Sequence, residues 1–238
     1  MIIDIHSHIL PEIDDGSKSI SMSIEMLTAM KSQGVDFVVA SPHFYYKKHD
    51  FESFLRRREE ACANLKNALI NFGLEEGVAI PKIILGSETA YAFEIEKFKP
   101  LNQLCIENTN TLLLEMPFRE WSIEEINAIA SMIYSRNLTI VIAHLERYLQ
   151  MQKSDTVKAL LNLPVFIQIN SQSLLPMFGR NALLKLFKEG TAHILASDAH
   201  NMSDRMPNLD AGRNVIAKKL GNIKLEEIDE TTKKLINL

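Results

Sequence analysis

Seven short apolar runs recur along the chain, each rich in Ile, Val and Leu. Within each run the apolar residues are mostly continuous rather than alternating with polar ones. This is typical of strands in a parallel sheet that is buried on both faces. We therefore predict seven strands, which lie within residues 1–4, 35–41, 81–87, 111–116, 138–144, 164–170 and 192–198.

The segments between these runs carry apolar residues at spacings of three or four, which is the period of an amphipathic helix. In residues 19–34 this spacing is set by Ile20, Ile24 and Leu27, and Gly34 supplies a stop signal. The same reasoning predicts further helices over residues 50–73, 121–137, 179–190, 210–221 and 226–238.

The alternation of strands and helices indicates an α/β fold with right-handed crossovers and a largely parallel sheet. Residues 93–110, on either side of Pro100, form a less regular insertion. No internal repeat, low-complexity tract or shift in composition marks a domain boundary, and α/β barrels of this length form single units. We therefore expect one domain over residues 1–238, in which the sheet is either open or closed into a barrel.

Composition and charge narrow the class of protein. Hydrophobic residues make up 46% of the chain and charged residues 24%, which is typical of a folded globular protein. The formal net charge is −4 and acids and bases are mixed, so there is no basic footprint for nucleic acid. Cys62 and Cys105 are far apart and form no CxxC pair, which favours a reducing compartment. No signal peptide or membrane-inserting stretch is evident, so we expect a soluble, cytoplasmic protein.

Titratable residues follow almost every predicted strand, at the point where its apolar part ends. They are His6, His8, His43, Glu88, Glu115, His144, Asp198 and His200. In a closed βα barrel the carboxyl ends of the strands converge on one face, whereas an open sheet places its ligand in a crevice at one switch point. Because nearly every strand contributes such a residue, the pattern favours the closed barrel.

These residues have the chemistry of a metal centre. Imidazole and carboxylate groups suit Mn²⁺, Fe²⁺ or Zn²⁺. The His6-Ser7-His8 spacing places two imidazoles on one side of an extended segment, because side chains alternate with a period of two. A single catalytic zinc takes about three protein ligands, so this larger set implies two or three metal ions. Taken singly, Glu115 or Asp198 would more often be a helix cap or a salt-bridge partner.

Two histidines and an arginine-rich helix fall outside this pattern. His193 lies at the start of its apolar run, at the opposite end of the strand, and His49 lies in a polar loop. We assign neither to the metal centre. Arg56, Arg57 and Arg58 precede two glutamates on a predicted helix, so we expect a solvated face with local ion pairs.

Arg147 and Arg205 follow two of the same strand ends. Beside divalent cations an arginine is unexpected unless an anion binds there, and its planar guanidinium suits phosphate oxygens. The alternative is a pair of surface arginines bridged to carboxylates. The chain has no glycine-rich phosphate loop and no thiolate phosphatase loop. A phosphorylated substrate attacked by metal-activated hydroxide is therefore the simplest interpretation.

The ordered set of motifs resembles a known superfamily. Residues 4–16 (DIHSHILPEIDDG) and the later motifs SPH, GSE, LLLEMP, HLERY and SDAH are similar to the polymerase and histidinol phosphatase (PHP) superfamily. Within it they most resemble the manganese-dependent protein-tyrosine phosphatases that bacteria encode with capsule and exopolysaccharide genes. The resemblance covers the chain from residue 2 to about residue 215. It implies a distorted TIM-like (β/α)7 barrel of the PHP type with a trinuclear centre.

The resemblance also implies roles for individual residues. The positions of the metal ligands are matched by His6, His8, Asp15, His43, Glu88, Glu115, His144, Asp198 and His200, with Glu88 as the bridge. Arg147 and Arg205 match the positions that hold the phosphate. Asp15 is chosen because the matching acid of the family directly precedes a glycine, here Gly16, and the neighbouring Asp14 stays an alternative.

The implied activity is hydrolysis of phosphotyrosine with two or three divalent metal ions, Mn²⁺ before Fe²⁺ or Zn²⁺. Phosphatases of this kind act on the tyrosine-rich tail of a membrane-bound bacterial tyrosine kinase that controls polysaccharide export. The alternative on the same scaffold is a phosphatase for histidinol phosphate or another small phosphomonoester. A nuclease is disfavoured by the acidic charge balance, and a non-enzymatic scaffold by the complete ligand set. The general acid for the leaving group is left open.

Overall fold

The structure, a computed structural model, describes all residues from 1 to 238. Strands and helices alternate along the chain. The strands are β1 (Ile2–Ser7), β2 (Val35–Ala40), β3 (His43–Tyr45), β4 (Lys82–Leu85), β5 (Glu88–Ala90), β6 (Thr111–Glu115), β7 (Thr139–Ile142), β8 (Phe166–Asn170) and β9 (Ile194–Ala196). The α-helices are α1 (Ile20–Ser32), α2 (Phe51–Asn71), α3 (Ile123–Arg136), α4 (Ser154–Leu161), α5 (Arg180–Lys188), α6 (Leu209–Leu220) and α7 (Asn222–Leu235).

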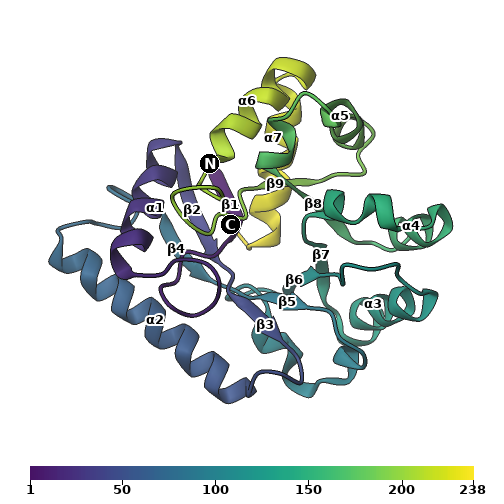
Figure 1. The fold of residues 1–238 in the computed structure, drawn as a ribbon, viewed down its shortest axis with the longest axis horizontal. Helices are drawn as coiled ribbons and strands as arrows, with labels where there is room; N and C mark the ends of the chain where they lie inside the picture. Colours follow the sequence, from purple (N-terminus) through teal and green to yellow (C-terminus); the bar gives the residue numbers. More distant parts are fainter.

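The strands form two parallel sheets, with the orders β1-β2-β4 and β3-β5-β6-β7-β8-β9. Two of the predicted runs, which form β2 and β4, are each followed two residues later by a short strand of the other sheet. The chain passes from β2 into β3 through Ser41 and Pro42, and from β4 into β5 through Gly86 and Ser87. All seven predicted strands are therefore present, and the two short strands β3 and β5 are additional to the prediction. Figure 1 shows the helices arranged around the outside of the strands.

Hydrogen bonds close the ring between the first and last strands. The amide of Asp198 donates to the carbonyl of His6 over 2.9 Å, and the amide of His8 donates to the carbonyl of Ala199 over 2.8 Å. The predicted closed barrel is therefore confirmed, in a distorted form with its strands divided between two sheets. The carboxyl ends of the strands share one face of this barrel, as in other closed βα barrels.

The passage from β4 to β5 depends on two residues that are far apart in the sequence. A Cβ atom on Gly86 would lie 2.8 Å from Cγ1 of Val39, so a larger residue would force a shift. Arg58 of α2 is only 7% exposed, and its Nη1 donates to the Gly86 carbonyl over 3.1 Å and to the Ser87 hydroxyl over 3.0 Å. The expectation of a solvated arginine face is therefore wrong for Arg58, whereas its two arginine neighbours are exposed.

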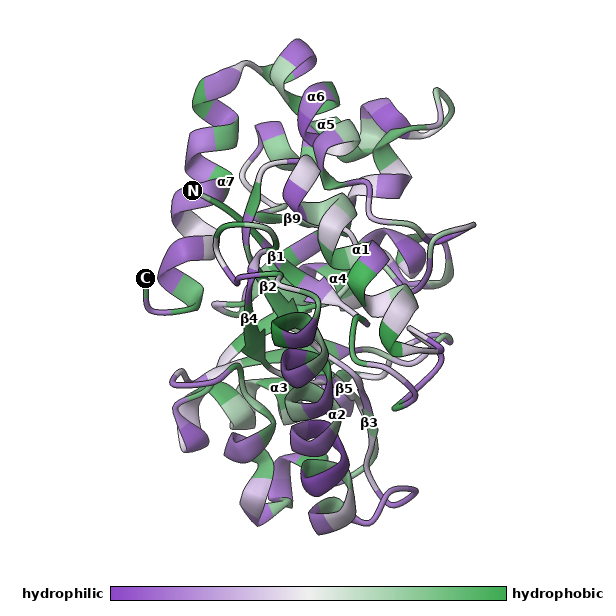
Figure 2. Cartoon of the chain, turned by 90° about the vertical axis from the view of Figure 1, so that its left-hand side faces the viewer, coloured by the Kyte–Doolittle hydropathy of each residue, from purple (hydrophilic) through white to green (hydrophobic).

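Both faces of the strands are buried, which explains why the apolar runs are continuous. In β6, Leu112 and Leu114 belong to a cluster of 44 buried apolar residues, while Leu113 belongs to a second cluster of 11. Successive side chains of a strand point to opposite faces, so the two clusters pack against opposite faces of β6. In Figure 2 the strands β2 and β4 are green, while the outward face of α2 is largely purple.

The helices begin and end where the sequence signals are strongest. Ser122 and Glu125 cap α3 reciprocally, and Gly221, with a positive φ, follows α6. The sequence pattern does not predict α4, which has eight residues and no side-chain cap. The irregular insertion contains the short 3₁₀ helices Ile95–Lys97 and Lys99–Leu104.

No helix combines the length and the apolar content needed to cross a membrane.

Candidate metal centre

The titratable residues predicted at the ends of the apolar runs meet around Glu88, which is buried at the start of β5. Its Oε2 atom lies 3.2 Å from Nε2 of both His6 and His8. The same oxygen lies 3.0 Å from Nδ1 of His43, and Oε1 lies 2.9 Å from Nε2 of His144. Four imidazoles from three strand ends therefore surround one buried carboxylate.

The other predicted ligands complete three overlapping groups of possible metal-binding atoms. Within each group the atoms lie within 4.8 Å of one another. The groups are His8, Asp15, His43 and His200; His6, His8, Glu88 and Asp198; and His43, Glu88 and Glu115. His144 belongs to none of them, but its Nε2 lies 3.8 Å from Glu115 as well as beside Glu88. All nine residues predicted as ligands therefore lie in one place.

Several atoms of this centre are buried without the hydrogen bond that a buried polar group requires. Nδ1 of His43, Oδ1 of Asp198 and Nε2 of His200 have no hydrogen-bond partner. Such atoms are rare because they are costly to bury. In addition, Nε2 of His6 and Nε2 of His8 face each other over 3.2 Å, although each ring already meets an acceptor at Nδ1. Cations among these atoms would satisfy all of them, so the residues fit divalent metal ions.

The two adjacent aspartates of the first loop have different surroundings. Asp14 accepts hydrogen bonds from Nδ1 of His8 over 2.7 Å and from two backbone amides over 2.9 and 3.0 Å. The side chain of Asp15 is 60% exposed, and its Oδ1 lies 3.4 Å from Nε2 of His43 and 3.5 Å from Nε2 of His200. Asp14 therefore orients His8, whereas Asp15 faces the possible metal-binding atoms.

Arg147 and Arg205 reach the centre through one carboxylate. Nη2 of Arg147 donates to Oδ2 of Asp198 over 2.8 Å, and Nη2 of Arg205 donates to the same oxygen over 2.9 Å. Oδ1 of Asp198 lies 3.3 Å from Nε2 of His6. The arginine side chains are 33% and 32% exposed. They are bridged to a carboxylate, as the alternative predicts, but this carboxylate is buried in the centre and does not lie on the surface.

Two polar residues of β8 that sequence analysis missed connect the centre. Oε1 of Gln168 accepts from the His144 amide over 2.9 Å and lies 3.1 Å from Nδ1 of His6. The side-chain nitrogen of Gln168 donates to Asn170 over 2.7 Å, and Asn170 donates to Asp198 over 2.8 Å. The signal in the sequence was a pair of polar residues at alternate positions of an apolar run, on the same side of the strand.

Tyr148 is a third residue that sequence analysis missed. It is fully buried, and its hydroxyl lies 3.1 Å from Nδ1 of His144. Burial raises the pKa of Tyr148 far above its usual value, so the hydroxyl stays protonated at neutral pH. Tyr148 therefore positions the imidazole of His144, and its spacing of four residues in the HLERY motif was the available signal.

Burial and neighbouring charges shift the ionisation of these groups. Burial disfavours the charged form of His8, but Asp14 and Glu88 outweigh this effect and raise its pKa to about 10. Burial lowers the pKa of His43 to about 4, and burial together with Glu88 raises the pKa of Glu115 to about 7. A proton on His8 thus supplies positive charge that the carboxylates require, and a metal ion would replace it.

The two remaining histidines lie outside the centre, as predicted. Nδ1 of His49 accepts from the Tyr45 amide over 3.3 Å, and Nδ1 of His193 accepts from the Ile167 amide over 3.1 Å. Neither belongs to a group of possible metal-binding atoms. Both histidines therefore have structural hydrogen bonds.

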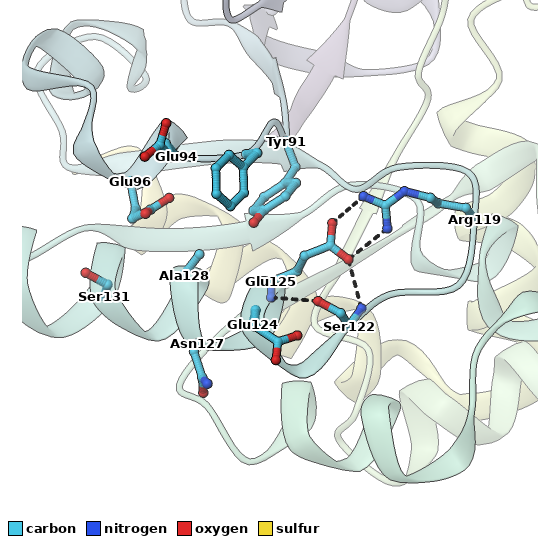
Figure 3. Close-up of a pocket in the computed structure, with 11 residues that line it drawn as sticks. Tyr91, Glu94, Glu96, Arg119, Ser122, Glu124, Glu125, Asn127, Ala128 and Ser131 are labelled. Atoms are coloured by element: carbon cyan, nitrogen blue, oxygen red, sulfur yellow. Dashed lines mark hydrogen bonds and ion pairs between the residues drawn. The ribbon is translucent and has the colours of Figure 1, made fainter.

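A hollow of about 620 Å³ lies beside the centre and contains none of the predicted ligands. Figure 3 shows its walls, which include Tyr91 after β5 and an ion pair between Arg119 and Glu125 with N–O distances of 2.9 and 2.6 Å. The amide of Tyr91 donates to the carbonyl of Glu115 over 2.7 Å. The hollow is therefore a neighbour of the predicted metal centre and is separate from it.

Known proteins share this chain's pattern over nearly its whole length. A family model described as capsular polysaccharide synthesis, CpsB/CapC, matches residues 2–236. The tyrosine-protein phosphatase CpsB of Streptococcus pneumoniae is 31% identical over 238 residues, which cover 95% of this chain and 94% of the relative. The CpsB of Streptococcus agalactiae serotype III is 28% identical over 237 residues, with the same two coverages of 95% and 94%.

A solved structure shares the fold. It comes from work on YwqE of Bacillus subtilis and CpsB of Streptococcus pneumoniae, described as unique metal-dependent tyrosine phosphatases. The TM-score is 0.82 at 26% sequence identity, and the match covers 99% of this chain and 94% of the solved one. The family model and the solved structure both match nearly the whole chain, including all of the residues that form the His/Asp/Glu centre. The chain belongs to the CpsB/CapC family of capsular polysaccharide synthesis.

Proposed function

We propose that this chain is a metal-dependent tyrosine-protein phosphatase that hydrolyses phosphotyrosine. The observation that carries the proposal is the buried centre around Glu88, whose unpaired imidazole and carboxylate atoms lie beside two arginines on Asp198. The relatives described above support it, since they are named tyrosine-protein phosphatases. The solved relatives are described as metal-dependent.

We assign as metal ligands His6, His8, Asp15, His43, Glu88, Glu115, His144, Asp198 and His200. Glu88 would bridge the ions, because its two oxygens face four imidazoles. Three groups of ligand atoms suit two or three ions, and Mn²⁺ is our first choice among the metals that these donors accept. When bound, such ions supply Lewis acidity and lower the pKa of a water molecule from 15.7 towards about 7.

Arg147 and Arg205 are assigned to hold the phosphate. A guanidinium offers five N–H donors, and each of these side chains donates to Asp198 from one Nη atom. Both side chains are partly exposed, so a phosphate can reach their remaining donors. Arginines placed there stabilise charge on the phosphate oxygens as it develops.

The leaving group favours an aryl ester over an alkyl ester. The phenolate of tyrosine has a pKa of about 10, so it needs less protonation than an alkoxide does. The carboxylates of the centre are all assigned as metal ligands or, in the case of Asp14, as the partner of His8. A substrate with a good leaving group is therefore the best match for this set of residues.

The proposal extends to the partner and the compartment. The family is one of capsular polysaccharide synthesis, so we propose as substrate the phosphorylated tail of a membrane-bound bacterial tyrosine kinase that controls capsule or exopolysaccharide synthesis. Cys62 and Cys105 are both free, which suits a cytoplasmic location. Histidinol-phosphate phosphatase is not favoured, because the relatives described above are named tyrosine-protein phosphatases.

The test is a substrate panel with Mn²⁺-loaded protein. Phosphotyrosyl peptide, histidinol phosphate and single-stranded DNA are compared by phosphate release and strand cleavage. We expect the peptide to turn over fastest, His6→Ala or EDTA to abolish turnover, and His193→Ala, outside the centre, to retain it. Faster turnover of histidinol phosphate would replace the tyrosine assignment by a small-molecule one.

A further inference from the structure

We propose that Phe118 is a specificity-determining residue whose ring covers the tyrosyl ring of a bound substrate. The proposal rests on the tyrosine phosphatase function above and names the part of the substrate that Phe118 would contact. Phe118 lies three residues after Glu115, in the loop between β6 and α3, and it is 57% exposed. It belongs to neither the ligand set nor the pair of arginines.

The exposed ring of Phe118 lies against the centre. Its centroid is 6.3 Å from that of His144, and the two rings are inclined by only 22°. It is 4.9 Å from the ring of Tyr148, which is buried and is itself in contact with His144. Phe118 therefore stacks over one of the assigned ligands while more than half of the residue remains accessible to a partner.

The backbone around Phe118 restricts where the ring can go. The carbonyl of Pro117 accepts from the indole of Trp121 over 2.9 Å and from the Arg119 amide over 2.8 Å. Arg119 is in turn held by the ion pair with Glu125 that Figure 3 shows. The loop is fixed on both sides of Phe118, so little ordering is needed when a substrate ring arrives.

A ring at this place distinguishes aryl phosphates from alkyl phosphates. Arg147, assigned to the phosphate, ends the 3₁₀ turn that follows His144. In an aryl phosphate the ring is bonded directly to the bridging oxygen. We infer that a phosphate held by Arg147, between His144 and Tyr148 in the sequence, places this ring beside Phe118, which contacts both. Contact between two aromatic rings strengthens binding by roughly two- to tenfold beyond the effect of the buried area. An alkyl phosphate offers no ring for this contact.

Tyr45 is a second aromatic residue whose ring lies beside that of an assigned ligand, His43. Its ring centroid lies 5.3 Å from that of His43, and the two rings are inclined by 29°. Tyr45 is less accessible than Phe118, and the Nζ atom of Lys48 lies 5.3 Å from its ring centroid. Phe118 is therefore the ring with more accessible surface for a substrate, and the better choice for a test.

The test compares phenylphosphonate with methylphosphonate, which differ in the ring and have no leaving group. Binding to Mn²⁺-loaded protein is measured by calorimetry. In Phe118→Ala we expect the affinity for phenylphosphonate to fall about three- to tenfold and that for methylphosphonate to change less than about twofold. Phe118→Leu keeps an apolar group without a ring, so its affinity for phenylphosphonate should lie between those of the wild type and Phe118→Ala. For phosphotyrosyl peptide, Phe118→Ala should raise KM and leave kcat nearly unchanged.

Phe178→Ala is the matched control, because Phe178 is 96% exposed in the loop before α5. We expect this variant to bind both phosphonates as the wild type does. An unchanged ratio of the two affinities in Phe118→Ala would overturn the role of Phe118. Failure of the wild type to release phosphate from phosphotyrosyl peptide would overturn the proposed function instead, whichever way the phosphonate ratio falls.

Discussion

Asp198 joins the two parts of the proposed site. Its Oδ1 atom faces His6, among the possible metal-binding atoms. Its Oδ2 atom accepts from Asn170, Arg147 and Arg205 over 2.8, 2.8 and 2.9 Å. Because three donors hold one oxygen, we expect Asp198 to stay in place when any one of them is removed. The contribution of each arginine to phosphate binding can therefore be separated from metal binding.

Arg147→Ala should keep its metals and lose most of its activity. Removing one preorganised donor to a developing oxyanion costs about 100-fold or more in rate, so we expect a fall of that size in kcat/KM for phosphotyrosyl peptide. Steady-state kinetics and elemental analysis of the same sample measure the two properties. Arg56→Ala, on the exposed face of α2, should resemble the wild type. Loss of metal from Arg147→Ala would show that this arginine is structural.

Glu146 makes stability depend on pH. Its Oε1 accepts from the Asn170 amide over 3.1 Å and from the Ser173 hydroxyl over 2.9 Å, while Oε2 is buried without a partner. Burial raises its pKa to about 7. The folded state therefore binds this proton more tightly than the unfolded state does. The resulting stabilisation is lost as the pH rises from the unfolded value through about 7.

Glu146→Gln removes this ionisation and keeps a carbonyl oxygen for both donors. We expect the free energy of unfolding of the variant, minus that of the wild type, to be larger at pH 8 than at pH 5. The difference is at most about 3 kcal/mol, since one pKa unit corresponds to about 1.4 kcal/mol. Urea unfolding of metal-free protein at both pH values measures it. Glu226→Gln, on an exposed position of α7, should show no such change, and a flat result for Glu146→Gln would refute the linkage.

Among the strands, β8 carries a chain of amide groups whose orientation follows from the hydrogen bonds. The amide of His144 can only donate, so the atom of Gln168 that it meets is the carbonyl oxygen, and Nδ1 of His6 must donate to it too. The Gln168 nitrogen then donates to Asn170, which donates to Asp198. In the neutral imidazole that metal binding requires, Nε2 of His6 is therefore the nitrogen that presents an electron pair to the centre.

Gln168→Ala should weaken metal binding without removing any ligand. Outer partners of metal ligands typically contribute 10- to 100-fold to affinity, so we expect the Kd for Mn²⁺ to rise by about that factor. Titration of metal-free protein with Mn²⁺ measures this. Gln103→Ala, an exposed glutamine in the insertion, is the control. An unchanged Kd in Gln168→Ala would mean that His6 is oriented without β8.

The features that the sequence predicts depend on residues close together in the chain, whereas several of those that it misses depend on distant residues. Most strands and helices are predicted well because apolar periodicity and caps are local signals. The helix α4 is missed because it is short and uncapped, and β3 and β5 are missed because they have only three residues each. The predicted ligands share a local signal too, a titratable residue at a strand end. Neither Arg58 nor Gln168 is a titratable residue at a predicted strand end. The alternation of polar residues in β8 marks Gln168 but does not identify its partner His6, 162 residues away. Nothing local identifies Ser87, 29 residues away, as the partner of Arg58.

The chain as a whole forms the centre only when the barrel closes. The bonds between β1 and the segment after β9 bring His6 and His8 to Asp198 and His200. The first loop can return to this place because Gly16 has no side chain. A Cβ atom there would lie 2.4 Å from Cβ of His8. Ligands from both ends of the chain thus meet at one face, and metal binding is coupled to the folded barrel.

The most direct measurement is a titration of metal-free protein with Mn²⁺, followed by phosphate release from a phosphotyrosyl peptide. We predict no release without metal and a rise that saturates at two or three equivalents per chain, in keeping with three groups of ligand atoms. His6→Ala should show no rise over the same range. Hydrolysis of the peptide at full rate by the metal-free chain, or by His6→Ala, would contradict a metal-dependent tyrosine phosphatase built around Glu88.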